Sequence, residues 1–271
     1  MHIYITLMVM HKSFFEIRYL MDINFVQLTL LFFAGLGAGV INALAGGGSF
    51  MTVPLLIFTG LEPTVANATN RLAVWIQCFF GTRKLYMMGY FPKNYCFKVV
   101  WPMLAGTLIG AYLLTVIPDE TFRKYFAFFM VLMTLVTFFK PASKIQQTDV
   151  GFTGKSLAVN YFIYFFIGIY IGFIQAGVGF MIIAASVISG LGMVRANAVK
   201  MFLNLSAATI SLIIFFYAGK VLILPALAMG AGMSLSAVIA SGMSVKVSDV
   251  FLKRLVSVVI LIFAVLLLVT K

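Results

Sequence analysis

Long apolar segments, each bounded by a short charged or polar stretch, recur from about residue 25 to the end of this 271-residue chain. Apolar residues make up 63% of the sequence and charged residues only 10%, too little polar surface to cover a water-soluble globule. The segments are rich in Leu, Ala, Met, Phe and small residues, without the alternation typical of a membrane β-barrel. Because backbone groups in lipid must pair within their own segment, the sequence predicts an all-α membrane bundle.

Basic residues outnumber acidic residues by 19 to 7. They are spread over the stretches between apolar segments and form no patch with stacking aromatics, so nucleic-acid binding is not expected. Two single cysteines, Cys78 and Cys96, have no CxxC spacing and no nearby His. We interpret both as packing residues and expect no metal and no cofactor.

A polar stretch divides the apolar segments into two series. The first series is expected at 25–44, 48–59, 64–82, 97–117 and 121–139, and the second at 158–176, 179–190, 195–217, 222–243 and 250–270. Residues 140–157, KPASKIQQTDVGFTGKSL, predict a linker between a first membrane repeat at 25–139 and a second at 158–271. Residues 1–24 predict an N-terminal extension whose apolar run, MHIYITLMVM, is too short to cross a bilayer, and Met21 is the hypothesised natural start.

The two series resemble each other residue by residue. FFAGLGAGVINA at 32–43 matches FFIGIYIGFIQA at 165–176, and TGLEPTVANATN at 59–70 matches SGLGMVRANAVK at 189–200. Between these runs, GGG in the first series meets GVG in the second. The match, which predicts a duplication, pairs Gly35 with Gly168, Gly39 with Gly172, Asn42 with Gln175 and Asn67 with Asn197.

The charge distribution bears on topology. If all five segments of each half cross, the second repeat is inverted, and the loops at 83–98, 140–157, 191–195 and 244–254 share one side. That side carries eleven basic residues and the other side six. If the short second segment of each half only dips in and returns, the chain has eight full spans and this bias weakens. The positive-inside rule favours inverted repeats in a multi-pass protein of the cell inner (plasma) membrane, with a cytoplasmic linker.

The second segment of each half is too short to cross. Twelve helical residues cover about 18 Å, against a hydrocarbon core of about 30 Å. Short, glycine-interrupted segments at matching places indicate a transporter site at the repeat interface. Here they are NALAGGGSF at 42–50 and QAGVGF at 175–180, and a helix that starts after such glycines presents free N–H groups to an anion. The alternative is that the glycines only allow close packing.

The run GLGAGVINALAGGGSFMTVPLLIFTGLEPTVANATNRLAV at 35–74, with its weaker echo at 168–205, resembles the TauE/SafE (TSUP) family of sulfite exporters. The resemblance covers about residues 25–270 and rests on GxxxGxxxxxxGGGSxxxxPLL followed by AxATN. It implies a membrane transporter of small sulfur-containing anions such as sulfite, sulfoacetate or other organosulfonates. In the second half GVGF and NAVK replace GGGS and NATN, which favours the first half as the determinant of selectivity.

Polar residues near the glycine breaks can donate to oxyanion oxygens, although one such residue alone is more often a helix–helix contact. Arg71 has no Asp or Glu within four residues, and an ionisable group in a membrane segment is a functional hypothesis by default. Arg71 and Lys200 either meet the anion or snorkel to the headgroups. The predicted substrate-binding residues are Asn42, Gly46, Gly47, Gly48, Ser49, Asn67, Asn70, Arg71, Gln175, Gly177, Gly179, Asn197, Lys200 and Asn204.

Catalytic chemistry is not expected. The seven acids fall in loops or at helix ends, and both histidines lie in the N-terminal extension, so no catalytic set and no proton-relay carboxylate can be assembled. We predict alternating access at the repeat interface, with a small anion and the lipid bilayer as partners. A channel-like anion pore and a non-transporting membrane partner protein are the alternatives. The sequence leaves the exact substrate, direction, coupling ion and homo-oligomerisation open.

Overall fold

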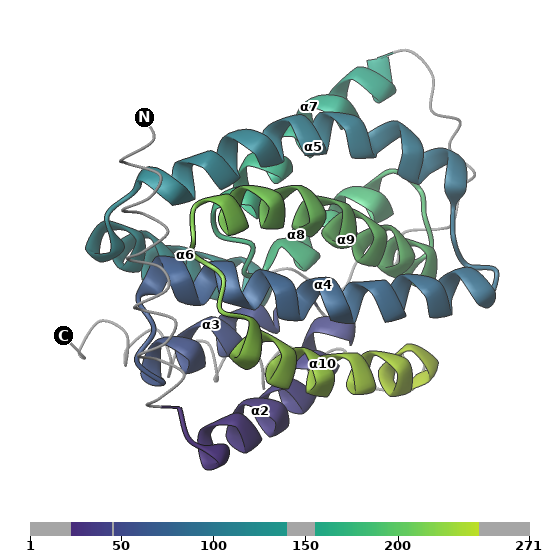
Figure 1. Ribbon diagram of the computed structural model, residues 1–271. Coiled ribbons are helices and arrows are strands. Elements are labelled where there is room, and N and C mark those ends of the chain that lie inside the picture. Colours follow the sequence, from purple (N-terminus) through teal and green to yellow (C-terminus); the bar gives the residue numbers. More distant parts are fainter. Residues whose placement is uncertain (1–22, 45, 140–154, 244–271) are drawn as a thin grey trace.

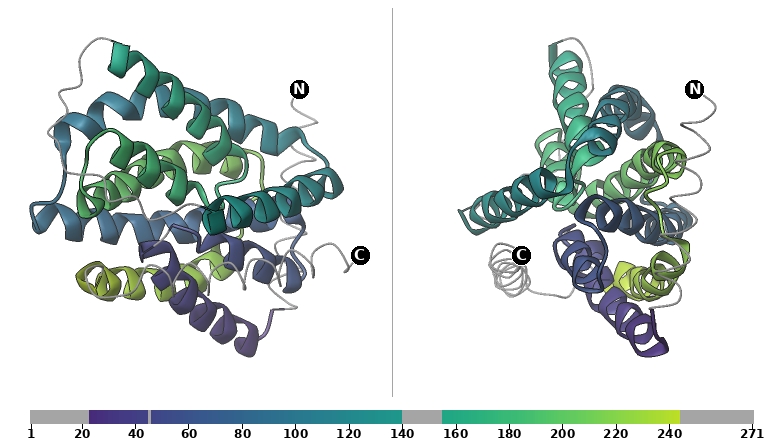
Figure 2. Two further views of the ribbon diagram at one scale, coloured as in Figure 1. Left: turned by 180° about the vertical axis from the view of Figure 1, so that it is seen from behind. Right: turned by 60° about the vertical axis from the view of Figure 1, so that its left-hand side comes forward.

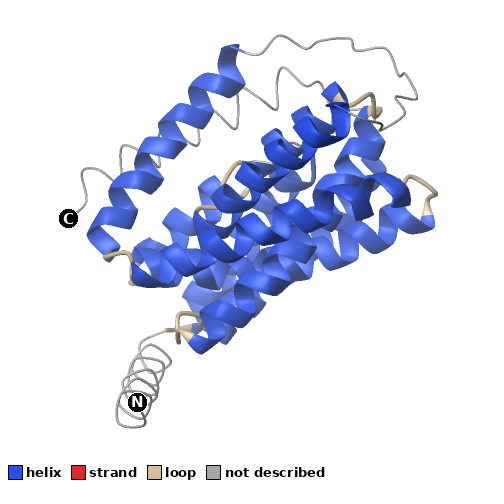
Figure 3. Ribbon diagram, turned by 90° about the horizontal axis from the view of Figure 1, so that it is seen from above, coloured by secondary structure: helices blue, strands red, loops and turns tan. Residues whose placement is uncertain are grey.

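The computed structural model describes residues 23–44, 46–139 and 155–243, which form nine α-helices and no strand (Figures 1 and 3). The N-terminal extension up to residue 22 and the segment expected at 250–270 lie outside the described residues. The helices are α2 (Phe25–Leu44), α3 (Ser49–Phe58), α4 (Pro63–Met87), α5 (Lys93–Val116), α6 (Asp119–Phe139), α7 (Lys155–Phe173), α8 (Val178–Ile188), α9 (Met193–Tyr217) and α10 (Ile223–Met243).

Each described helix coincides with one expected segment. The helix α4 runs five residues further than expected, to Met87, and α7 begins at Lys155, inside the stretch expected as a linker. Four of the described helices are long and apolar enough to cross a membrane, namely Phe25–Ala43, Lys93–Val116, Met193–Tyr217 and Ile223–Ala240. The helical membrane class predicted from composition is therefore supported.

Local sequence sets the ends of these helices. Before α2, the Asn24 side chain accepts a hydrogen bond from the Gln27 amide at 2.8 Å, and the Gln27 side chain accepts one from the Asn24 amide at 3.1 Å. This reciprocal pair satisfies two backbone donors at the helix start. The short helices α3 and α8 both end before a glycine in the left-handed region, Gly60 at φ +96° and Gly190 at φ +93°. The matched glycines stop both helices because few other residues adopt this conformation without strain.

The central pair of the bundle is α4 and α9, which cross its middle (Figures 1 and 2). On one side of this pair α10 packs along α2, and on the other side α5 packs along α7. Both flanking pairs join a helix before residue 140 to a helix after residue 154. The two parts of the chain are therefore interleaved rather than folded as two separate bundles.

Glycines bring the paired helices into backbone contact. A Cβ on Gly168 of α7 would collide with the carbonyl of Met103 in α5, and one on Gly106 of α5 would collide with the carbonyl of Phe165 in α7. The α2–α10 pair has the same arrangement, with Gly35 against Met229 and Gly232 against Phe32. Small residues at a helix crossing are the usual way to gain close packing in a membrane.

The helix connections gather at two ends of the bundle. Lys220 Nζ donates to Thr64 Oγ1 at 2.6 Å, and the Thr64 amide donates to Asp119 Oδ1 at 2.7 Å. These contacts join the α9–α10 turn, the start of α4 and the start of α6. Ser189 after α8 donates to Asn160 Oδ1 of α7 at 2.9 Å. The α9–α10 turn lies at the left in Figure 1, and the start of α7 lies at the right. The short helices α3 and α8 therefore end at opposite ends of the bundle.

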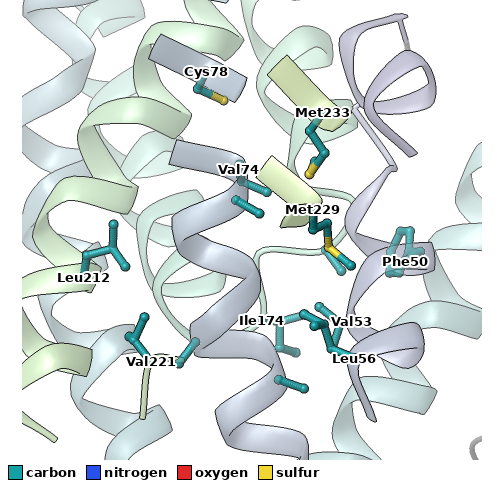
Figure 4. Close-up of a cluster of buried hydrophobic side chains, with 14 of the residues drawn as sticks. Phe50, Val53, Leu56, Val74, Cys78, Ile174, Leu212, Val221, Met229 and Met233 are labelled. Carbon is teal, nitrogen blue, oxygen red and sulfur yellow. The ribbon is translucent and has the colours of Figure 1, made fainter. Parts of the chain in front are cut away.

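The short helix α3 is held by an apolar cluster. Phe50, Val53 and Leu56 on α3 are fully buried and share this cluster with Val74 of α4 and Ile174 of the α7–α8 connection (Figure 4). Burying such side chains fixes α3 more firmly than its ten residues alone could, because short isolated helices are marginal. The cluster thus fixes the position of the break between α2 and α3.

Replacement of Gly168 tests the close α5–α7 packing. We expect Gly168→Ala to lower the melting temperature of the detergent-solubilised protein, because overpacking at a backbone contact costs about 1–3 kcal/mol. Gly37→Ala on α2 is the matched control, since a Cβ there meets nothing within 4 Å. It should leave the melting temperature unchanged or raise it slightly. Equal behaviour of the two variants would contradict the packing described.

Candidate functional site

The two glycine breaks meet in the centre of the bundle. Gly46 lies between α2 and α3 with φ +88°, and Gly179 lies in the first turn of α8. A Cβ on either glycine would collide with the backbone of the other. The N-termini of α3 and α8 therefore start side by side, each with its first backbone N–H groups outside the helical hydrogen-bond pattern. Two helix N-termini at one point create a positive potential that favours an anion.

The remaining glycines of the predicted set belong to these breaks. Gly47 accepts a backbone hydrogen bond from Phe50 in the first turn of α3. Gly48 precedes α3, and its Cα approaches the Ala38 carbonyl of α2 too closely for a side chain. Gly177 precedes α8 with φ +75°. These positions admit the sharp reversals at both breaks.

Arg71 of α4 is completely buried. Its guanidinium donates to the carbonyls of Ile171 and Gly172 at 2.5 and 3.1 Å and lies 5.5 Å from the ring centroid of Phe215. Both carbonyls belong to the last turn of α7, where the helix dipole is negative. The Nε atom of Arg71 has no partner within the described part of the protein.

Lys200 of α9 has the corresponding arrangement with α2. It is completely buried, and its Nζ donates to the carbonyls of Asn42 and Ala43 at 2.7 and 3.1 Å. Each central helix thus directs a cation to the C-terminus of a broken helix from the other part of the chain. The alternative prediction that Arg71 and Lys200 snorkel to the headgroups is wrong, because neither side chain reaches the surface.

Carboxylates do not neutralise these two cations within the described residues. The acids there are Glu62, Asp119 and Glu120, and none of them is buried. Over the same ranges the one salt bridge joins Lys124 to Glu120 at 2.7 Å on the surface. A buried charge without an opposite charge is costly, and helix-end carbonyls compensate it only in part. The centre of the bundle therefore favours a bound anion.

The amides Asn42 and Gln175, which the repeat aligns, differ in the structure. Asn42 Nδ2 donates to Gln77 Oε1 at 2.5 Å, and Gln77 Nε2 donates to the Gly39 carbonyl at 2.9 Å. Both polar atoms of the Gln175 side chain are buried without a partner in the described structure. At φ +65°, Gln175 is also the one non-glycine residue with positive φ among the described residues. Strain and unpaired polar atoms together keep Gln175 as a candidate for contact with a ligand.

Other amides of the set are paired to different extents. Asn70 accepts from Thr52 Oγ1 at 2.7 Å and donates to Ser49 Oγ at 3.3 Å, which ties α4 to the start of α3. Asn67 Nδ2 donates to the Phe173 carbonyl at 3.0 Å, next to the carbonyls that Arg71 binds. The side-chain oxygens of Asn67, Asn197 and Asn204 are buried and unpaired within the described protein.

Two residues beside the site were missed at the sequence level, Gln77 and Phe215. Gln77 lies seven residues after Asn70 on α4, so its helical spacing was a usable signal. The contact of Phe215 with Arg71 depends on how α9 crosses α4 and had no local signal.

A helical membrane bundle with two broken helices meeting beside buried cations defines a membrane transporter. The family model described as "Sulfite exporter TauE/SafE" matches residues 31–267. The chain therefore belongs to the TauE/SafE family.

The names of its relatives agree with this class. The chain is 28% identical over 257 residues to a Sinorhizobium protein named "Probable membrane transporter protein ORF9", covering 91% of this chain and 94% of the relative. It is 28% identical over 208 residues to a "Probable membrane transporter protein" of Haemophilus influenzae, covering 74% and 79%. It is 26% identical over 201 residues to "Probable membrane transporter protein YfcA" of Escherichia coli K12, covering 72% of each chain. No solved structure matches the chain.

The different pairing of Asn42 and Gln175 predicts opposite effects on stability. Asn42→Leu should lower the melting temperature in detergent, because it leaves the buried Gln77 oxygen unpaired at a cost of about 1–3 kcal/mol. Gln175→Leu removes two unpaired atoms and should leave stability unchanged or higher. The double variant Asn42→Leu/Gln77→Leu should recover part of the loss. A larger loss for Gln175→Leu than for Asn42→Leu would refute this assignment.

Proposed function

We propose that this protein transports small sulfur-containing anions, sulfite and organosulfonates, across the cell inner membrane. The observation that carries the proposal is the pair of buried cations, Arg71 and Lys200, without a carboxylate partner in the described structure. A neutral or cationic substrate would leave their charge uncompensated. An anion would offset it at the moment of binding.

The chemistry around the glycine breaks suits an oxyanion. Sulfite and sulfonate groups present three oxygens that accept hydrogen bonds, and guanidinium, ammonium and amide groups are matching donors. Arg71 contributes an unpaired Nε, and Gln175 contributes an unpaired amide. The N-termini of α3 and α8 add backbone donors without charge. The description of the family as a sulfite exporter supports sulfur among the candidate oxyanions.

We infer an inverted-repeat architecture for this transporter. It is supported by the matched short helices α3 and α8, the matched pairs α2–α10 and α5–α7, and the exchange of cations between halves. The Lys220–Thr64 hydrogen bond favours the topology in which all five segments of each half cross, so that α3 ends on the side of the membrane where α2 begins. The eight-span alternative would separate these two residues by the membrane. On the favoured path, Arg83, Lys84, Lys93, Lys98 and Arg195 share one end, which the positive-inside rule makes cytoplasmic.

Transport on this architecture would proceed by alternating access. The α2–α10 and α5–α7 pairs are each tightly packed through glycines, so each can move as a unit. The central helices α4 and α9 connect these units, and Arg71 of α4 binds α7 while Lys200 of α9 binds α2. Movement of one unit against the other would open the central site first to one side and then to the other.

Charge removal at the centre tests the proposed function. We expect Arg71→Gln or Lys200→Gln to raise the KM for sulfite and sulfoacetate flux in proteoliposomes by about 10- to 100-fold, the value of a lost charge-assisted hydrogen bond. Lys124→Gln, which removes an exposed lysine, is the matched control and should leave flux unchanged. Arg71→Lys keeps the charge but loses the planar fork, so its effect should be intermediate.

The same flux assay can also contradict the proposal. Wild-type flux should saturate with anion concentration, respond to an imposed potential and show counterflow. Flux that does not saturate would support a channel-like pore instead. Absence of flux for every sulfur anion would reject the substrate class, and unchanged flux in both charge variants would reject the site.

A further inference from the structure

One face of α9 carries a series of polar side chains. Asn197, Lys200, Asn204 and Ser211 follow each other at intervals of three, four and seven residues, and Phe215 comes four residues later. At 3.6 residues per turn these five positions lie on the same side of the helix. We refer to them as the α9 polar face.

Three of the four polar side chains on this face have a polar atom without a partner. Asn197 Oδ1, Asn204 Oδ1 and Ser211 Oγ are buried and have no hydrogen-bond partner among the described residues. Buried polar atoms in proteins are paired in the large majority of cases, with protein groups, water or ligand. Three unpaired groups along one helical face therefore indicate that water or a ligand lies against it.

The neighbouring face of α9 is different. Val199 and Leu203 are completely buried in an apolar cluster with residues of α5, α7 and α8, such as Val99, Tyr164 and Ile182. The helix thus carries one packed apolar face and one face with unpaired polar atoms, and both faces are buried.

The α9 polar face extends over most of a bilayer. Residues 197 to 215 rise about 27 Å along a helix, close to the hydrocarbon thickness of about 30 Å. Lys200 lies near one end of the face, and the guanidinium of Arg71 lies over Phe215 at the other end. The two buried cations are therefore held at different depths, with Asn204 and Ser211 between them along α9.

We propose that the α9 polar face lines the route of the anion across the protein, and that Ser211 is a binding group on it. This inference rests on the proposed anion transport and specifies its path. The anion would pass between Lys200 and Arg71 along Asn204 and Ser211. The serine hydroxyl donates one hydrogen bond to an oxyanion oxygen, and each asparagine amide can turn its NH2 group toward it.

Thiol accessibility tests the route without relying on flux. Single cysteines are introduced at Asn197, Asn204 and Ser211 in a Cys78→Ala/Cys96→Ala background of the full chain in membrane vesicles. The probe is methanethiosulfonate ethylsulfonate, a membrane-impermeant anion, with and without sulfoacetate. Val199→Cys and Leu203→Cys are the matched controls, since these positions lie on the same helix and are fully buried. We expect labelling of the polar face at least tenfold faster than of the controls, and slower in sulfoacetate.

The outcomes distinguish failure of the proposed route from failure of the proposed function. Equal labelling of both faces, or none on the polar face, would overturn the route even if sulfoacetate is transported. Selective labelling without protection by sulfoacetate would support the route and count against the substrate class. Ser211→Ala offers a second measurement with minimal change in volume, and we expect it to raise the KM for flux about fivefold, the effect of one hydrogen bond. An unchanged KM in this variant would remove Ser211 from the route.

Discussion

Two cation-to-carbonyl contacts support the centre of this protein. Arg71 of α4 binds the last carbonyls of α7, and Lys200 of α9 binds the last carbonyls of α2. A helix that stops inside a membrane bundle leaves carbonyls unpaired where water is scarce, which is costly. The cations make such breaks tolerable, and each contact links a helix of one part of the chain to a helix of the other.

The breaks in turn create the site. Because α2 and α7 stop at the centre, the chain reverses through Gly46 and Gly177, and α3 and α8 begin where Gly46 and Gly179 touch. Backbone donors meet there, and a buried cation caps each of the two broken helices without a buried carboxylate in the described structure. On the proposed function, structural capping and anion binding would therefore depend on the same two side chains. An arriving anion competes with helix carbonyls for the cations, which offers a physical link between binding and movement of the two units.

Local patterns predicted much of this fold. Apolar segments, glycine breaks and matching motifs placed every described helix to within a few residues and identified the TauE/SafE family, which the family model confirms. Contacts between distant segments could not be predicted in this way. Asn42 and Gln175 align in sequence, yet Asn42 pairs with Gln77 while Gln175 stays unpaired. Similarly, the partners of Arg71 and Lys200 lie 100 or more residues away and follow from the crossing of α4 and α9.

The central claim is that Arg71 and Lys200 bind an anion, and thermal unfolding of the purified protein in detergent measures this most directly. A ligand that binds only the folded state stabilises it by about 2.7 kcal/mol at one hundred times its Kd. The account predicts that sulfite or sulfoacetate raises the melting temperature of the wild-type protein above that in chloride of equal ionic strength. It predicts no such rise in an Arg71→Gln/Lys200→Gln variant. An equal rise in both proteins, or none in the wild type, would contradict the claim.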